Sequence, residues 1–141
     1  MTRIVVGVDG SPASEAALHW ALIHATKVGG SVHALMSWNE HPILAGLSET
    51  IGGGVPLDVV EEQANGLLDA TIEAATPADN TVSITQEAVS GAPADVLINA
   101  AVDADLLVVG RHAKQGILHL GSVSTRVARE ATCPVVVVPS R

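Results

Sequence analysis

Two short segments carry polar residues whose types and spacing fit ligand binding. The tetrapeptide Gly121-Ser122-Val123-Ser124 opens a helix-like segment, where unpaired backbone N–H groups and two hydroxyls favour an anion such as phosphate. Asp9 follows a Val-rich run near the N-terminus, and its carboxylate can accept hydrogen bonds from amino or hydroxyl groups. Serine at a helix start is also ordinary capping, and Asp-Gly is a common turn pair. Capping and ligand binding therefore both remain open for each segment.

Other chemistry is poorly represented in the sequence. The Gly-x-x-x-x-Gly-Lys-Ser/Thr order of a Walker P-loop is absent, and no dinucleotide fingerprint follows the first apolar run. The histidines lack a metal-ligand spacing along the chain, so they are expected at surface or lightly buried positions. Cys133 has no context that would lower its thiol pKa. Without a nucleophile, a partnered base or a metal-ligand cluster, efficient catalysis is not expected.

The elements that position these residues alternate along the chain. Runs rich in Val, Ile or Leu predict five strands, at Arg3–Asp9, Ser31–Trp38, Thr81–Val89, Asp105–Val109 and Pro134–Val138. Ala-rich segments and three-to-four spacing predict four helices, at Pro12–Val28, Pro56–Ala75, Ala92–Ala104 and Ser122–Ala131. This alternation predicts an α/β fold, a doubly wound parallel sheet with helices on both faces. Ligands of such sheets bind beyond the carboxyl ends of the strands, where the strand order reverses.

Composition limits the partners. A chain of 141 residues with 48% hydrophobic content fits a single domain, residues 1–141. Seven Lys plus Arg against 15 Asp plus Glu give a net charge of −8, which disfavours binding to nucleic-acid phosphates or anionic lipid. One cysteine allows no internal disulfide, and no apolar run approaches the roughly 18 residues of a membrane span. A cytoplasmic protein is expected.

Three stretches, in chain order, resemble the universal stress protein family. They are IVVGVDGSPASEAALHWA, LLVVGRHAKQGILHLGSVSTRVARE and ATCPVVVVP, and together the resemblance covers the whole chain. It implies an adenine nucleotide alpha hydrolase-like fold, with a five-stranded parallel sheet in the order 3-2-1-4-5 and four helices. It also implies a homodimer and two subgroups, of which one binds ATP and the other does not.

The resemblance implies a set of nucleotide-binding residues in this chain. Val8 and Asp9 would lie near adenine and ribose, Ser37 beside the adenine, and Val109 and Gly110 beneath the nucleotide. Phosphates would be held by Gly121, Ser122, Val123 and Ser124, and His112 falls where the family tolerates histidine. The implied ligand is ATP with Mg²⁺, and because no catalytic group is evident the expected activity is at most slow ATP hydrolysis.

The glycine pattern of the ATP-binding subgroup is incomplete here. That pattern is Gly, two residues, Gly, nine residues, then Gly-Ser or Gly-Thr. Gly110 and Gly121-Ser122 match its ends, but Ala113 replaces the second glycine and the following interval is two residues shorter. A methyl group at 113 obstructs a positive φ and a close approach of phosphate. Two functions stay open: an ATP-binding, nucleotide-responsive stress protein, and a dimeric protein-interaction module that binds no nucleotide.

The last predicted strand favours self-association. A bare VVVV edge offers unpaired backbone groups, and pairing Pro134–Val138 with a second copy would cover them. In a monomer, a helix or the C-terminal tail would have to cover this edge. A flavodoxin-like enzyme or receiver is a third class, but the single Asp9 and the ending Pro139-Ser140-Arg141 lack the acidic cluster and lysine of a receiver. The stretch Asn39–Pro56 is expected to be a loop near the site.

Overall fold

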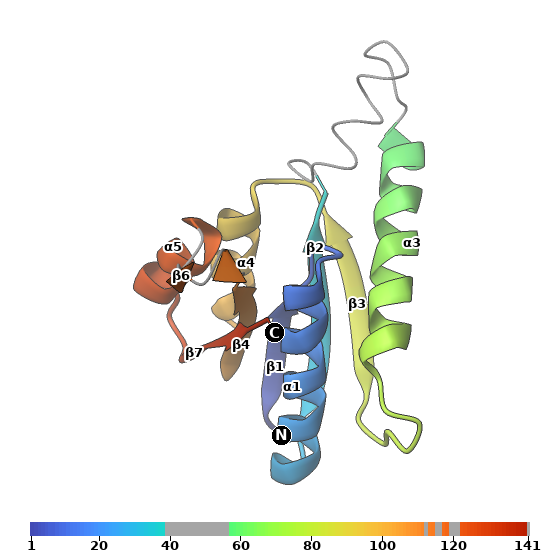
Figure 1. Ribbon diagram of the computed structural model, residues 1–141, viewed down its shortest axis with the longest axis vertical. Helices are drawn as coiled ribbons and strands as arrows, with labels where there is room; N and C mark the ends of the chain where they lie inside the picture. The colour runs from blue at the N-terminus through green and yellow to red at the C-terminus, as the bar shows by residue number, and fades with distance from the viewer. Residues whose placement is uncertain (39–56, 112, 115–116, 119–121, 141) are drawn as a thin grey trace.

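The computed structural model describes residues 1–38, 57–111, 113–114, 117–118 and 122–140, and the predicted loop Asn39–Pro56 lies outside them. Five strands form one parallel sheet in the order β3-β2-β1-β4-β7 (Figure 1). They are β1 Arg3–Gly7, β2 Ser31–Ser37, β3 Ile84–Val89, β4 Leu106–Arg111 and β7 Val135–Pro139. The helices are α1 Pro12–Val28, α3 Leu57–Ala75, α4 Pro93–Ala101 and α5 Ser122–Glu130. The predicted fold class and the 3-2-1-4-5 order are confirmed.

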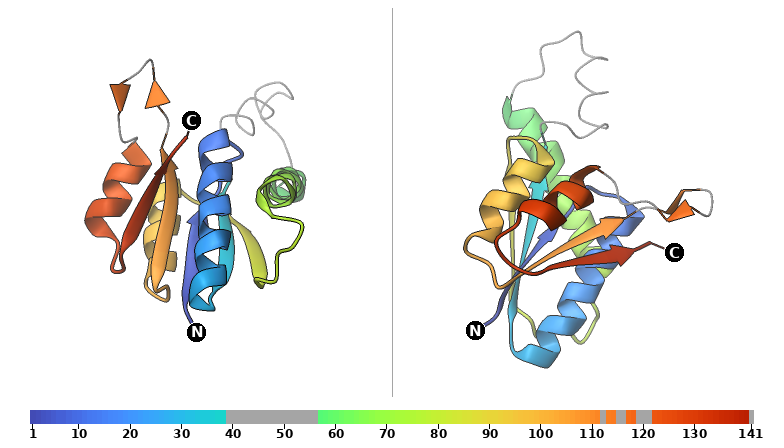
Figure 2. Two further views of the ribbon diagram at one scale, coloured as in Figure 1. Left: turned by 60° about the horizontal axis from the view of Figure 1, so that its bottom comes forward. Right: turned by 90° about the vertical axis from the view of Figure 1, so that its left-hand side faces the viewer.

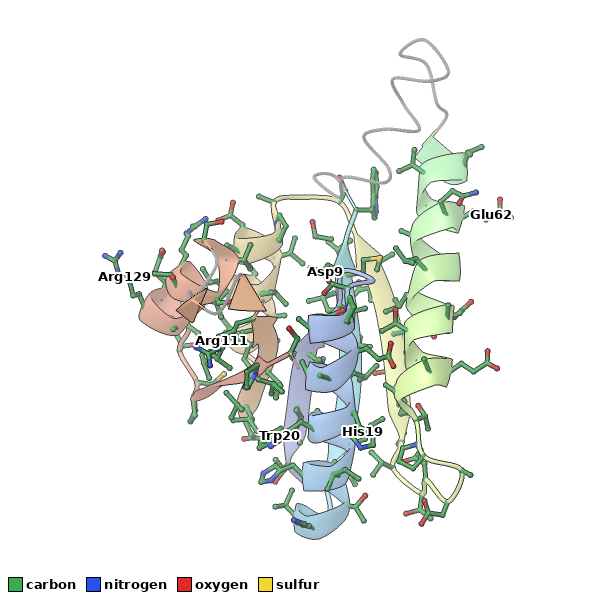
Figure 3. The ribbon with its side chains drawn as sticks, in the orientation of Figure 1. Asp9, His19, Trp20, Glu62, Arg111 and Arg129 are labelled. Carbon is green, nitrogen blue, oxygen red and sulfur yellow. The ribbon has the colours of Figure 1, made fainter. Side chains whose placement is uncertain are left out.

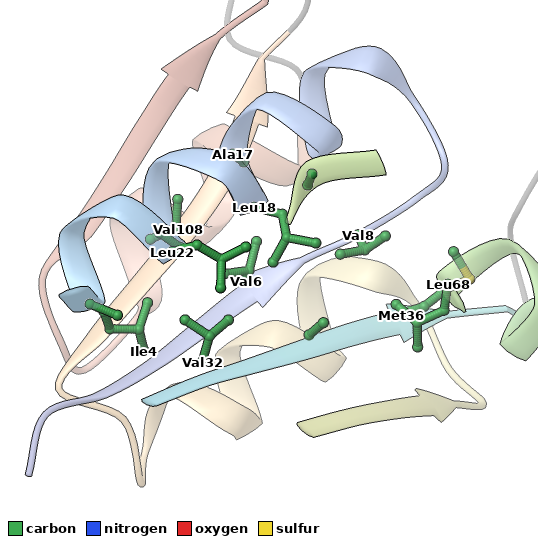
Figure 4. Packing of buried hydrophobic residues seen from close by; sticks show 14 of the residues in the cluster. Ile4, Val6, Val8, Ala17, Leu18, Leu22, Val32, Met36, Leu68 and Val108 are labelled. Carbon is green, nitrogen blue, oxygen red and sulfur yellow. The ribbon is translucent and has the colours of Figure 1, made fainter. Parts of the chain in front are cut away.

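Helices cover both faces of the sheet, so the molecule has two cores. Figure 2 shows α1 in front of the sheet and α4 behind it. On the α1 and α3 side, Val6, Leu18 and Val108 pack together and are fully buried (Figure 4). On the α4 and α5 side, the core contains Val5 and Leu107, also fully buried. Because β1 and β4 are buried on both faces, their sequences are continuous apolar runs without alternation.

The ends of α1 have local causes. Ser11 is the N-cap residue, and its side chain accepts a hydrogen bond from the Ser14 N–H while Pro12 occupies the first turn. Gly29 ends the helix with φ 71°, a left-handed conformation that glycine adopts without steric cost. The chain then enters β2 directly.

Two predicted boundaries were wrong by about three residues. β3 begins at Ile84 rather than Thr81, because the Asn80 side chain bonds to both the N–H and the carbonyl of Val82 and holds a turn there. α4 ends at Ala101 rather than Ala104. The next three N–H groups, up to that of Ala104, donate to carbonyls three residues back, so the helix tightens into turns.

A small hairpin follows β4 where the sequence predicted only a phosphate-holding loop. Strand β5, Ala113–Lys114, pairs antiparallel with β6, Ile117–Leu118. Figure 2 shows the two short strands standing apart from the main sheet. Ala113, which replaces a family glycine, is therefore a strand residue paired with Leu118.

Candidate functional site at the carboxyl ends of β1 and β4

The strand order reverses between β1 and β4. From β1 the chain adds β2 and then β3 on one side, whereas β4 and β7 lie on the other. β1 and β4 pair directly, with Val6 opposite Val108, so their carboxyl ends lie side by side. In doubly wound sheets this reversal is where ligands bind. The predicted residues on the two strand ends are therefore brought to one edge.

The loop from β1 to α1 places Asp9 at this edge. The Asp9 side chain is exposed, and Figure 3 shows it at the N-terminal end of α1, whereas His19 and Trp20 lie further along the helix. Asp9 Oδ1 accepts the Ser11 N–H at 2.9 Å, and the Asp9 N–H donates to Ser14 Oγ at 3.3 Å. The turn role of Asp9 is thus present. A ligand role is compatible with it, because a carboxylate accepts several hydrogen bonds.

Gly110 has a packing role at the end of β4. A Cβ added at this position would stand 3.0 Å from Ala13 Cβ and overlap the Ala13 carbonyl group in the first turn of α1. Glycine is therefore what lets α1 approach β4 this closely. The same contact fixes the start of α1, and with it the Asp9 turn, against the exit of β4.

The start of α5 is bonded to the same strand end. The Ser124 hydroxyl donates to the Gly110 carbonyl at 3.2 Å, and the residue is only 5% exposed. Val123 packs against the core on the α4 and α5 side, while Ser122, the first residue of the helix, is exposed. Of the two hydroxyl residues predicted to hold phosphate, Ser122 is exposed to solvent, whereas the Ser124 hydroxyl is already hydrogen-bonded to β4. Gly121, at the junction, lies outside the described residues.

The remaining predicted residues divide between core and edge. Val8 and Val109 are each 4% exposed and belong to the two cores, one on each face of the sheet. Ser37 ends β2 beside β1, and its hydroxyl donates to the carbonyl of Gly91 in the turn before α4. Ser37 is thus at the carboxyl edge but bonded within the protein. His112 lies outside the described residues.

One charged side chain of α5, the helix that begins at this edge, is held by two ion pairs. Arg126 on α5 bonds to Glu130 at 2.9 Å and to Asp95 on α4 at 2.6 Å. These carboxylates, Glu130 first, raise the pKa of the Arg126 guanidinium above its usual value. Arg111 ends β4 half-buried, and its carbonyl accepts the Ser140 N–H at 3.0 Å. Among the described residues there is no group of three or more His, Cys, Asp or Glu able to hold a metal ion.

Sequence reasoning missed Ser14 as part of this edge. Ser14 is 4% exposed, accepts the Asp9 N–H and donates to the Ser11 carbonyl at 3.0 Å. The available signal was its place three residues after Ser11, the spacing of a reciprocal N-terminal cap. Ser14 therefore orders the turn that presents Asp9.

The fold and the site together define the class of the protein. It is a doubly wound α/β protein whose polar groups gather where the strand order reverses. The model of the universal stress protein family matches residues 1–139, and the chain belongs to this family.

Similar proteins agree with this assignment. A universal stress protein of Mycolicibacterium smegmatis is 34% identical over 140 residues, which cover 98% of this chain and 46% of the relative. The chain thus spans about half the length of the curated relatives that it matches. A universal stress protein solved in complex with cAMP is 27% identical, with a TM-score of 0.61 and coverage of 99% of this chain and 98% of that one. A universal stress protein structure from Archaeoglobus fulgidus, 24% identical with a TM-score of 0.69, covers 97% of this chain and 93% of its own and shares the fold. None of the helices in the described residues is long and apolar enough to cross a membrane.

Proposed function

We propose that the protein is a cytoplasmic, nucleotide-responsive regulatory protein that binds an adenine nucleotide, ATP with Mg²⁺, at the carboxyl ends of β1 and β4. The observation that carries this proposal is the convergence of two elements on Gly110. Ala13 packs against it from α1, and Ser124 bonds to its carbonyl from α5. An exposed carboxylate and an exposed helix start therefore share one edge. A similar protein, solved in complex with cAMP, supports an adenine nucleotide as the ligand.

The described residues fit a nucleotide by the chemistry of their groups. Asp9 offers a carboxylate that can accept ribose hydroxyl or adenine amino hydrogens. Ser122 offers an exposed hydroxyl at the first turn of α5, whose unpaired N–H groups favour phosphate. The side chains of Val8 and Val109 are buried in the two cores, so these residues would meet the nucleotide through their backbone at the ends of β1 and β4. Mg²⁺ would enter with the nucleotide, because substrate phosphates together with waters commonly supply much of its coordination.

A titration tests this function. Tag-free protein is titrated calorimetrically with ATP, AMP and cAMP, with and without Mg²⁺, and mass spectrometry identifies any copurifying nucleotide. We expect binding that Asp9→Ala and Gly121→Val each weaken about tenfold. The first substitution removes a hydrogen-bonding carboxylate, and the second adds a branched side chain where the phosphate would approach the backbone. Asp103→Ala is the matched control, because Asp103 is exposed in the turn before β4, at the opposite edge of the sheet.

Two results would overturn the nucleotide site. Unchanged affinity in both Asp9→Ala and Gly121→Val would remove the site at this edge. The absence of any binding at millimolar nucleotide would favour the second function, a protein-interaction module without nucleotide. That alternative rests on Ala113, which pairs in the β5–β6 hairpin where the ATP-binding subgroup has glycine.

The same proposal includes a homodimer formed through the C-terminal strand. β7 pairs with β4 on one side, and no strand of the described residues pairs with its other side. An open groove of about 640 Å³ runs beside it, lined by Trp20 and Ile23 of α1 and by Val138 to Ser140. A second copy whose strand pairs with β7 would cover both the unpaired backbone groups and this apolar surface.

A further inference from the structure

Three polar side chains cluster on the sheet away from the nucleotide edge. His33 of β2 lies directly opposite Thr85 of β3, and Glu87 lies two residues further along the same strand. Leu35, two residues after His33, belongs to the core on the α4 and α5 side, so the alternation of side chains places the cluster on that face. The His33 side chain is 14% exposed and that of Glu87 is 59% exposed. The cluster therefore opens to solvent at the β3 edge.

Both ring nitrogens of His33 are engaged, at different distances. Nδ1 lies 2.6 Å from Thr85 Oγ1, a short hydrogen bond. Nε2 lies 3.4 Å from Glu87 Oε1. A hydrogen bond between an ionised histidine and a carboxylate is usually about 2.7–2.9 Å. The second contact is therefore long for a hydrogen bond, although the first holds the ring firmly.

The long separation matches two ligands of one metal ion. A tetrahedral metal about 2.0–2.1 Å from two ligand atoms holds those atoms about 3.3–3.4 Å apart. When Nδ1 donates its proton to Thr85 Oγ1, Nε2 presents a lone pair toward the carboxylate oxygen. Two acceptors that face each other in this way are stabilised by a cation between them. A ligating histidine usually donates its other ring N–H to an oxygen acceptor, and the Thr85 hydroxyl oxygen can accept in this way.

We propose that His33 Nε2 and Glu87 Oε1 bind a divalent transition metal of the zinc type. Thr85 is a positioning residue that holds the imidazole ring and would accept the Nδ1 proton when the metal is bound. Imidazole with carboxylate suits Zn²⁺, whereas Ca²⁺ and Mg²⁺ prefer oxygen ligands alone. The exposure of Glu87 leaves the other coordination positions to water. Bound metal would join the edge strand β3 to β2.

Zinc titration of the whole chain tests the site. Tag-free protein, freed of metal by chelation, is titrated calorimetrically with Zn²⁺, and Co²⁺ absorption reports tetrahedral geometry. We expect His33→Gln and Glu87→Gln each to weaken binding at least tenfold. Thr85→Val should weaken it about threefold, and Thr85→Ser should restore it. Zn²⁺ should also raise the thermal unfolding midpoint of the unsubstituted protein but not of the Glu87→Gln variant.

A matched histidine variant isolates the site, because the chain has six histidines. His24→Gln removes a half-buried histidine of α1, whose ring stacks on Trp20 with centroids 4.9 Å apart, and should leave zinc affinity unchanged. Glu87→Gln changes an exposed side chain, so it keeps the test decisive even where His33→Gln unfolds. Two results would overturn the proposal. One is wild-type zinc affinity in Glu87→Gln, and the other is no zinc binding by the unsubstituted protein at about 100 μM Zn²⁺.

Discussion

Gly110 at the end of β4 lies directly against Ala13 in the first turn of α1, with no space for a side chain between them. A Cβ on Gly110 would stand 3.0 Å from that of Ala13 and overlap its carbonyl group. Family resemblance alone would give this glycine a role beneath the nucleotide. The structure adds a role in folding, because the contact sets how closely α1 approaches the sheet.

Gly110→Ala should therefore destabilise the protein whether or not nucleotide is present. The added methyl has to displace backbone of α1, and overpacking of this kind costs about 1–3 kcal/mol. Urea unfolding followed by circular dichroism measures the change as a lower midpoint with an unchanged slope. Stability equal to that of the unsubstituted protein would show that α1 shifts without cost.

Gly66→Ala should have the opposite effect. Gly66 is an exposed residue in the interior of α3, and a Cβ there would meet no atom within 4 Å. Alanine lowers the backbone entropy of the unfolded chain and favours the helix by about 0.5–1 kcal/mol. The same urea experiment should show a higher midpoint. A lower midpoint would mean that the α3 surface at this position is covered in solution.

The strands could be predicted from apolar runs in the sequence, whereas their order was implied by the family resemblance. Val5 and Val6 are both fully buried because β1 has helices on each face, and such strands are recognisable as continuous apolar runs. The start of β3 was predicted less well, since it depends on how the Asn80 side chain bonds to Val82. A side chain that can bond locally in several ways gives no unique boundary.

The contacts within the site depended on register and could not be predicted from spacing. Ser124 and Gly110 were both predicted as site residues, but the bond between them arises from how α5 packs on β4. His33 and Glu87 are 54 residues apart in the chain and meet only because β2 pairs with β3 in one register. Metal-ligand spacing along the sequence cannot detect such a pair.

Alanine substitutions at Ser122 and Ser124 should affect different properties, nucleotide affinity at Ser122 and folding stability at Ser124. Ser124→Ala removes the bond to the Gly110 carbonyl and leaves a half-buried acceptor unpaired, which costs about 1–3 kcal/mol. Ser122→Ala changes an exposed hydroxyl and should leave stability within about 0.5 kcal/mol while weakening nucleotide binding. Urea unfolding and ATP titration of both variants make the comparison. Equal stability of the two variants would contradict the assignment of roles.

Cys133 should react slowly with alkylating reagents at neutral pH. Partial burial raises the pKa of the thiol above its usual value. Its own backbone hydrogen bond opposes part of this rise, and the nearby Asp105 charge adds a smaller increase. A raised pKa leaves less thiolate at a given pH, and the thiolate is the reactive form. Iodoacetamide labelling followed by mass spectrometry should therefore accelerate only at alkaline pH. Asp105→Asn should move that acceleration to lower pH, and an unchanged profile would leave burial as the sole cause.

The backbone of β7 offers a selective way to block dimerisation. The Leu107 N–H donates to the Pro134 carbonyl, and the Ser140 N–H donates to the Arg111 carbonyl. Even-numbered residues of this segment therefore bond to β4, and alternation turns the N–H of Val137 toward the free edge. Val137→Pro removes an N–H group that points away from β4. An edge strand tolerates proline at such a position.

We expect the unsubstituted protein to be a dimer and the Val137→Pro variant to be a folded monomer. Sedimentation at micromolar concentrations measures the oligomeric state, and circular dichroism checks that the variant is folded. Val136→Pro is the matched contrast, because its N–H faces β4 and its loss should destabilise the fold itself. A Val137→Pro protein that remains dimeric would exclude pairing through β7. In that case the groove beside Trp20 would be covered by some other contact.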